Sequence, residues 1–176
     1  VSMQSSISGV SSIKEKVFVP ELLDTAINMS ILSAKDKEIE IIKEFESSPL
    51  LNIDKSKLLQ IFINLIQNAR DSTLANSDTP LKEIKLSIQK ADDNMLQINI
   101  EDNGIGIEEA NLNRIFAFGF TTKVNGHGFG LHSSALSAQE MGGALKAYSQ
   151  GVGQGAQFVL TLPLKEVSGS KGVFNE

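Results

Sequence analysis

Two asparagines and an aspartate, Asn64, Asn68 and Asp71, lie four and three residues apart in a stretch with helical periodicity. On a helix they fall on one flank of the apolar stripe that faces the core, at the rim where a pocket between helix and sheet would open. Asparagine amides are neutral oxygen ligands, which suit a Mg²⁺ ion that already carries phosphate oxygens. The alternative is a solvated polar edge, because asparagine is an ordinary surface residue.

An aspartate directly follows an alternating apolar strand. The apolar residues of 96–100 lie two apart, and Asp102 continues their inward-facing row. A buried carboxylate is costly unless a group donates a hydrogen bond to it, and the exocyclic amine of adenine is such a donor. Gly104 and Gly106 would allow a ligand to approach the backbone closely. The alternative is that Asp-Asn-Gly only forms a turn.

A glycine-rich segment, TTKVNGHGFGL at 121–131, has the composition of a phosphate-binding loop. Its glycines precede a predicted helix, so backbone N–H groups and the helix N-terminus would form an anion site. Thr121, Thr122 and Lys123 add hydroxyls and a positive charge. Neither GxxxxGK[ST] nor GxGxxG after a strand occurs in the chain, so a nucleotide would need an architecture different from those of these two motifs.

These residues depend on helices and strands that the hydrophobic pattern predicts. Pro20 begins an amphipathic stretch that runs to about Ala34, and Asp54 is suited to cap a long helix that runs to about Leu74. Another helix is expected at about 129–141. Helices segregated from a mixed, mostly antiparallel sheet predict a two-layer α/β sandwich with the helices on one face. Strands are expected at 38–46, 82–90, 95–102, 144–149 and 156–163.

The composition fits one globular domain and excludes several classes of partner. The 176 residues carry a formal net charge of −5, whereas a nucleic-acid-binding domain would usually have a basic face. The chain has no cysteine, which excludes disulfides and fits the cytoplasm. No apolar run approaches the roughly 18 residues that span a bilayer, so we expect no membrane segment in this fragment, although the full-length protein could be anchored. We expect three segments, which are a leader at 1–16, a globular domain at 17–165 and a disordered tail at 166–176. An alternative for the leader is the end of a dimerisation helix.

Five short motifs follow one another along the chain. They are NLIQNARD at 64–71, DNGIGI at 102–107, RIFAFGFTTK at 114–123, GHGFGL at 126–131 and GxGAxF at 153–158. In order and spacing they resemble the N, G1, F, G2 and third glycine boxes of the superfamily of histidine kinases, gyrase, Hsp90 and MutL. The resemblance covers about residues 17–164. Any one motif would be a weak signal, but their sequence together is a strong one, and it points to the ATP-binding domain of a sensor histidine kinase.

The resemblance implies the Bergerat ATP-binding fold, with ATP and Mg²⁺ as ligands. By motif position, Asn68 would hold Mg²⁺ with Asn64 close by, and Asp102 would bind the adenine amine. Residues 111–130 would form a mobile lid over the ATP. Asn68 and Lys123 are the catalytic residues that it implies. The other implied nucleotide contacts are Asp71, Gly104, Ile105, Gly106, Phe116, Phe120, Thr121, Thr122, Gly126, His127, Gly128, Phe129, Gly130 and Leu131.

The resemblance also bears on the reaction. Hydrolases of the superfamily carry a glutamate four residues before the Mg²⁺ asparagine, as a base for water. Asn64 occupies that position here, and an amide cannot take a proton at neutral pH. The resemblance therefore implies transfer of the γ-phosphoryl group to a histidine on a separate helical hairpin, with a response regulator as partner and a homodimer in the full-length protein. The alternatives are an ATP hydrolase or a nucleotide-dependent regulatory module of the same superfamily.

Some positions depart from the superfamily pattern. Asp71 stands where many members have lysine, which leaves Lys123 as the main positive charge, and Ala156 stands where threonine is common. Neither His127 nor His132 is expected to be the phosphoacceptor, because neither lies on a long hairpin outside the pocket. His127 is a candidate phosphate contact, whereas His132 is expected to pack or hydrogen-bond locally.

Overall fold

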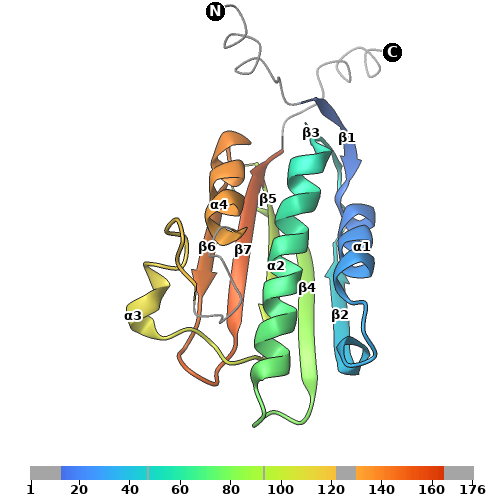
Figure 1. Cartoon of the computed structure of the whole chain (residues 1–176). Helices are drawn as coiled ribbons and strands as arrows, with labels where there is room; N and C mark the ends of the chain where they lie inside the picture. Colours follow the sequence, from blue (N-terminus) through green and yellow to red (C-terminus); the bar gives the residue numbers. More distant parts are fainter. Residues whose placement is uncertain (1–12, 47, 93, 122–129, 165–176) are drawn as a thin grey trace, which may run out of the picture.

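A mixed five-stranded sheet forms one layer of the fold, and helices α1, α2 and α4 lie together on one of its faces (Figure 1). The computed structural model describes residues 13–46, 48–92, 94–121 and 130–164, and it confirms the predicted two-layer α/β sandwich. The strand order is β2-β4-β5-β7-β6, with β2 parallel to β4 and the other neighbours antiparallel. The bounds are β2 Ile39–Phe45, β4 Lys82–Ala91, β5 Met95–Asp102, β6 Ala144–Tyr148 and β7 Ala156–Pro163.

The long helix α2 (Lys55–Ala75) packs against β4 and β5 in the middle of the sheet. Asp54 caps it as predicted, because its carboxylate accepts a hydrogen bond from the Lys57 amide at 3.1 Å. The predicted apolar stripe is buried, and this fixes which flank of the helix carries Asn64 and Asn68. The stripe consists of Leu58, Ile61, Phe62, Leu65, Ile66 and Ala69.

Two short strands that the sequence pattern does not predict pair outside the main sheet. β1 (Lys14–Phe18) and β3 (Leu50–Asp54) run antiparallel to each other. β1 overlaps the segment assigned to a leader, so regular structure begins before the predicted boundary at residue 17. Every residue of β1 except Val17 is exposed, and therefore no alternating apolar row marks it in the sequence. Residues 1–12 and 165–176, which hold most of that leader and the predicted tail, lie outside the described residues.

Helix α1 (Val19–Ser30) begins where it is predicted but ends before Ala34. A turn follows it, because the carboxylate of Asp36 accepts hydrogen bonds from the amides of Leu32 and Ser33 at 3.1 and 3.0 Å. The hydrogen bond from the Ser33 amide is the main reason why the pKa of Asp36 lies below its usual value. The remaining helices are η1 (Asp36–Glu38), α3 (Glu109–Leu112) and α4 (Gly130–Glu140).

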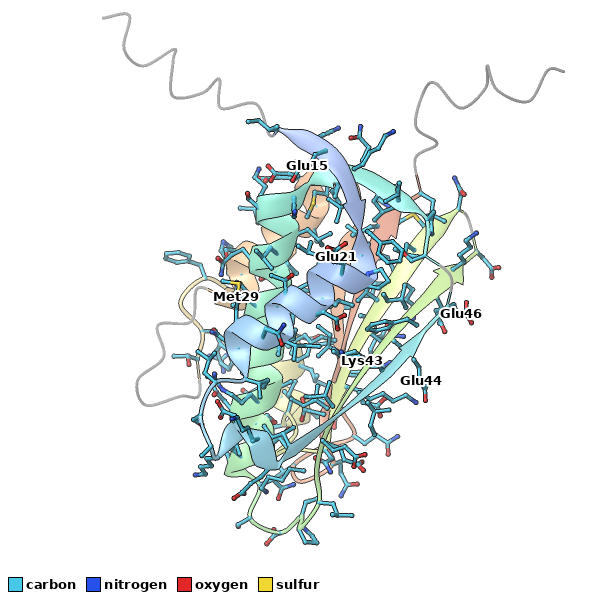
Figure 2. The ribbon with its side chains drawn as sticks, turned by 90° about the vertical axis from the view of Figure 1, so that its right-hand side faces the viewer. Glu15, Glu21, Met29, Lys43, Glu44 and Glu46 are labelled. Atoms are coloured by element: carbon cyan, nitrogen blue, oxygen red, sulfur yellow. The ribbon has the colours of Figure 1, made fainter. Side chains whose placement is uncertain are left out.

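Strand β2 is an edge of the sheet and carries charged side chains. Figure 2 shows Lys43, Glu44 and Glu46 along this edge. Lys43 pairs with Asp24 of α1 at 2.5 Å, and Glu44 pairs with Lys85 of β4 at 3.1 Å. Both pairs are largely exposed, so they contribute little to stability. Their charges instead disfavour the addition of another strand to this edge.

The core lies between the helices and the sheet. Its largest fully buried side chains are Phe62 of α2 and Phe158 of β7. The inward row of β5, Leu96, Ile98 and Ile100, is also fully buried, which confirms the predicted alternation. Among the residues that the structure describes, no helix has the length and apolar character needed to cross a membrane.

Candidate functional site

A cavity of about 700 Å³ opens between α2, the end of β5 and the loop that leads into β7. Pockets for small molecules commonly measure roughly 300–1,000 Å³. Asn68 and Asp102 line this same cavity, from α2 and β5 respectively. The full lining consists of Asn64, Gln67, Asn68, Asp71, Ser72, Ala75, Asp102, Ile105, Gly106, Ile107, Glu108, Asn111, Ile115, Phe120, Thr121, Gly130, Leu131, Val152, Ala156 and Phe158.

Asp102 ends β5 with its carboxylate buried in the cavity wall, where the residue is 5% exposed. Its Oδ1 accepts hydrogen bonds from the Ser72 hydroxyl at 3.1 Å and from the Gly104 amide at 2.8 Å. Its Oδ2 is buried and has no hydrogen-bond partner among the described residues. Burial raises the pKa of Asp102 to about 6, and the Gly104 amide, the Ser72 hydroxyl and the nearby Ala156 backbone oppose this rise. The site therefore fits a ligand that donates an N–H group to Oδ2, as the adenine amine would.

The loop after β5 is held against the C-terminal end of α2. The Ile105 amide donates to both the carbonyl and the hydroxyl of Ser72, at 3.1 Å in each case. Asn76, which is buried, donates to the carbonyls of Asn103 and Gly104 at 3.1 and 3.0 Å. A Cβ at Gly104 would lie 2.2 Å from Ser72 Oγ. Gly104 thus lets the loop approach the helix, and it packs behind the cavity wall.

Two glycines allow the loop after β5 to interlock with the loop before β7. Gly106 has a φ of 72°, and a Cβ there would lie 2.0 Å from the Gly151 carbonyl oxygen. Gly155 has a φ of 69°, and a Cβ there would lie 2.1 Å from the Asp102 carbonyl oxygen. Residues with a side chain rarely adopt such φ values. The two loops can therefore form one continuous wall of the cavity.

Asn64 joins α2 to the start of α4. Its Nδ2 donates to the Gly130 carbonyl at 3.2 Å and to the Ser134 hydroxyl at 3.1 Å. Its Oδ1 accepts a hydrogen bond from Gln60 Nε2 at 3.0 Å. The side-chain amide of Asn64 is thus engaged at both ends by protein groups, in addition to lining the cavity.

Asn68 and Asp71 line the cavity further along the same flank of α2, as their spacing predicts. Arg70 donates to Oδ1 of Asp71 from Nε at 3.1 Å and from Nη2 at 2.9 Å. Nη1 of Arg70 also donates to the Ser30 carbonyl at 2.7 Å, which ties this pair to the end of α1. The negative charge of Asp71 is therefore partly offset by its neighbour.

The described part of the predicted lid is anchored by aromatic contacts. The Phe116 ring packs edge-on against Phe158, with ring centroids 6.3 Å apart. The Arg114 guanidinium lies 5.1 Å from the centroid of Phe120, which lines the cavity. Nδ1 of His132 lies 3.0 Å from the Phe116 carbonyl oxygen, which confirms the local hydrogen bond expected of this histidine.

The predicted ligand residues fall into three groups. Gly104 and Phe116 pack behind the cavity and do not line it. The lining contains Asn64, Asn68, Asp71, Asp102, Ile105, Gly106, Phe120, Thr121, Gly130 and Leu131. Thr122, Lys123, Gly126, His127, Gly128 and Phe129 lie outside the described residues, so their contacts stay predictions.

Several lining residues carry no predicted role. Ser72 lies four residues after Asn68, so an extension of the helical row by one turn would have found it. Phe158 belongs to the strand expected at 156–163 and ends the motif at 153–158, but no individual role was assigned to it. Other lining residues lie within the motifs or the expected lid but carry no individual role, namely Gln67, Ile107, Asn111, Ile115 and Ala156. No comparable signal marks Ala75, Glu108 and Val152.

Comparison with known families agrees with this geometry. A family model described as histidine kinase-, DNA gyrase B-, and HSP90-like ATPase matches residues 53–166, which is more than half of the chain. The chain belongs to this family. The match to the histidine kinase-, DNA gyrase B-, and HSP90-like ATPases includes every residue that lines the cavity.

Two curated proteins similar to this chain are named as sensors. The chain is 40% identical over 111 residues to the two-component sensor PprA of Pseudomonas aeruginosa, a match that covers 61% of this chain and 12% of PprA. It is 32% identical over 157 residues to the sensor protein CitS of Halalkalibacterium halodurans, covering 85% of this chain and 29% of CitS. The chain therefore spans a small part of each of these relatives.

Two solved structures share the fold of this chain over most of its length. Full-length ShkA, solved in complex with AMPPNP, superposes with a TM-score of 0.74 at 26% identity, covering 88% of this chain and 32% of ShkA. The mycobacterial sensor histidine kinase MprB superposes with a TM-score of 0.72 at 22% identity, covering 86% of this chain and 97% of that structure. The likeness to MprB bears on the fold alone.

Proposed function

We propose that this domain binds Mg²⁺-ATP and presents the γ-phosphoryl group to a histidine on a separate helical hairpin, as one step of two-component signalling. The observation that carries the proposal is the buried Oδ2 of Asp102, which lacks a hydrogen-bond partner among the described residues and belongs to a residue that lines the same cavity as Asn68. An adenine amine would satisfy this oxygen, and the phosphates would then extend toward α2 and α4.

Each end of the cavity supplies a different part of this binding. At the base end, Asp102 accepts the adenine amine, and Ile105 and Gly106 cover the ring. At the phosphate end, Asn68 offers an amide oxygen to Mg²⁺, while Lys123 and the amides of 126–131 meet the phosphates, as the sequence motifs suggest. Bound Mg²⁺ would neutralise phosphate charge, which is the main requirement of phosphoryl transfer. Support for the adenine nucleotide also comes from ShkA, whose structure holds AMPPNP.

Transfer is favoured over hydrolysis by the residue at position 64. A hydrolase needs a base that takes a proton from water, and the Asn64 amide has no such capacity. Asn64 is also engaged by Gln60, Gly130 and Ser134. These contacts support a role in holding α4 and give no support to activation of water.

The partners of the parent protein follow from the same proposal. PprA and CitS are named as sensors, and this chain matches only a small share of each. We therefore propose that the phosphoacceptor hairpin belongs to the same parent protein, that the parent acts as a homodimer, and that a response regulator receives the phosphoryl group. ATP supply would place the domain in the cytoplasm.

The first test of the proposal is Asp102→Ala. We expect the affinity for ADP and for a non-hydrolysable ATP analogue to fall by about 100-fold, because a charge-assisted hydrogen bond and the anchor of the base are lost together. Isothermal calorimetry measures this effect. Glu101→Ala is a matched control, since Glu101 precedes Asp102 on β5 but is exposed. Nucleotide affinity that is unchanged in Asp102→Ala would refute the proposal.

The second test is Asn68→Ala. We expect loss of phosphotransfer to an added helical-hairpin domain that carries a phosphoaccepting histidine, by at least about 100-fold, because the metal would lose its protein ligand. Transfer of label from γ-³²P-ATP to the hairpin is the measurement. The control is Asn28→Ala, at an exposed position of α1. Steady phosphate release by the unaltered chain without hairpin would instead favour a hydrolase.

A further inference from the structure

The wall at the base end of the cavity is made by two loops that are distant in the sequence. Ile105, Gly106 and Ile107 come from the loop after β5, and Val152 comes from the loop between β6 and β7. Both loops are irregular backbone, so neither is held in place by the hydrogen bonds of a helix or of the main sheet. The shape of this wall therefore depends on what joins the two loops.

Backbone hydrogen bonds join the loops near the start of the first one. The Gly153 amide donates to the Ile105 carbonyl at 2.6 Å, and the Gly155 amide donates to the Gly104 carbonyl at 3.2 Å. The far end of the first loop, at Ile107, is beyond the reach of these two bonds. A different group is needed to fix that end.

The hydroxyl of Ser149 provides this junction. It accepts a hydrogen bond from the Ile107 amide at 3.0 Å and donates one to the Gly155 carbonyl at 2.7 Å. It also accepts from the Gly151 amide at 3.3 Å. A serine hydroxyl has one donor and two acceptor positions, so all three are used here. A single side-chain oxygen thus links both loops at the point where they diverge.

The position of Gly155 is transmitted directly to Asp102. Gly155 packs so closely on the backbone of Asp102 that a Cβ would lie 2.1 Å from its carbonyl oxygen. The Gly155 carbonyl is in turn held by Ser149. Displacement of Gly155 would therefore shift the strand end that carries the carboxylate. Ser149 itself does not line the cavity.

We infer that Ser149 is a positioning residue for nucleotide binding, whose hydroxyl holds the two loops together so that the base pocket has its shape before a ligand arrives. This inference rests on the proposed function and adds a residue outside the cavity to it. Because Ser149 acts at the base end, its loss should weaken all adenine nucleotides by the same factor, irrespective of the number of phosphates.

The test compares Ser149→Ala with Thr161→Val in the whole chain. Thr161 is the matched control, because its hydroxyl also bridges β7 and β6, to the Ala144 carbonyl at 3.4 Å, but at the opposite end of the strands. Calorimetry gives the affinities for ADP and for a non-hydrolysable ATP analogue. For Ser149→Ala we expect the affinities for the two nucleotides to fall by the same factor, about tenfold, because the substitution leaves polar backbone groups without their partner. Thr161→Val should bind as the unaltered chain does.

A second measurement does not depend on the variant's folding. In the unaltered chain, ADP should slow hydrogen exchange of the Ile107 amide, because the ligand stabilises the joined loops. The inference would be overturned if ADP did not slow this exchange, or if the affinities of Ser149→Ala stayed within twofold of those of the unaltered chain. It would also be overturned if Thr161→Val lost as much affinity, or if Ser149→Ala lost affinity for the ATP analogue alone. If the unaltered chain bound neither nucleotide, the proposed function itself would fail. If the unaltered chain bound both but Ser149→Ala bound them equally well, only the role of Ser149 would fail.

Discussion

The two carboxylate oxygens of Asp102 differ in their hydrogen bonding. Oδ1 has two donors, whereas Oδ2 is buried without one in the described part of the chain. The cost of desolvating this carboxylate is only partly offset in the folded protein, which is why its pKa lies near 6. A ligand that donates to Oδ2 recovers part of that cost, so the same atom that weakens the fold strengthens binding.

This environment predicts that binding of the base depends on pH. Because the pKa of Asp102 is raised to about 6, the residue is largely protonated at pH 5 and largely ionised at pH 7.5. The ionised form is the stronger acceptor, so the affinity for the base should rise with pH, with a midpoint near pH 6. We expect a change of about tenfold.

Adenosine is the ligand of choice for this measurement, since it has no phosphate that titrates in the same range. Its affinity can be followed by chemical-shift titration from pH 5 to pH 7.5. The control is Asp102→Asn, whose residual affinity should not vary with pH. A flat profile in the unaltered chain would contradict the acceptor role of the carboxylate.

At the scale of elements, α2 is the part that relates the cavity to its surroundings. It contacts β4 and β5 through its apolar stripe, α1 through Arg70, and α4 through Asn64. The cavity lies along the flank next to this stripe. Packing of the stripe therefore sets the position of Asn68 relative to Asp102, although the two side chains share no hydrogen bond in the structure.

The link between α2 and α4 predicts a measurable loss of stability. Asn64→Ala removes the hydrogen bonds to Gly130 and Ser134 and should lower the free energy of unfolding by about 1–2 kcal/mol. Urea unfolding is the measurement. Gln60→Ala is the control from one turn earlier on the helix, where the side chain is exposed, and it should change stability by less than about 0.5 kcal/mol. Equal effects of the two substitutions would argue against the link.

For the whole molecule, the hydrophobic core and the cavity share a boundary. Phe158 is 1% exposed as part of the core, yet it also lines the cavity and packs against Phe116. Phe62 is equally buried but is absent from the cavity lining. Phe158 and Phe62 are thus both core residues, but of these two only Phe158 is placed to contact a bound ligand.

This difference gives a paired prediction. Phe158→Ala and Phe62→Ala should each lower the free energy of unfolding by about 3–5 kcal/mol, because each leaves a cavity in the core. Of the two, Phe158→Ala alone should also weaken ADP binding, measured by calorimetry at a temperature where both variants remain folded. If Phe62→Ala weakened binding as much, the effect would reflect general loosening of the core.

Local patterns in the sequence were sufficient for much of the fold and for part of the site. The buried row that ends at Asp102, the cap at Asp54 and the stripe of α2 each depend on spacing within one element, and the structure has them as predicted. The end of α1 differs from the prediction, because the turn closed by Asp36 interrupts a stretch that is still apolar.

Features that depend on contacts between distant segments were not predictable. β1 and β3 pair across more than thirty residues of sequence. In β1 only Val17 is buried, so no alternating pattern marks it, whereas β3 buries Leu51 and Ile53 but is only five residues long. The role of Ser149 rests on hydrogen bonds to two loops, and its position in the sequence does not reveal such bonds. For Lys123 and its neighbours the motif is still the source of the prediction, since they lie outside the described residues.

The pairing of Asp102 with Ala156 has a consequence for synthesis of the protein. A chain that emerges from the ribosome releases α2 and β5 well before β7 (Ala156–Pro163). Until β7 docks, the carboxylate lacks the strand beside it and Phe158 is missing from the cavity lining. A nascent or prematurely terminated chain that stops before β7 would therefore have no complete cavity, however well its first half had folded.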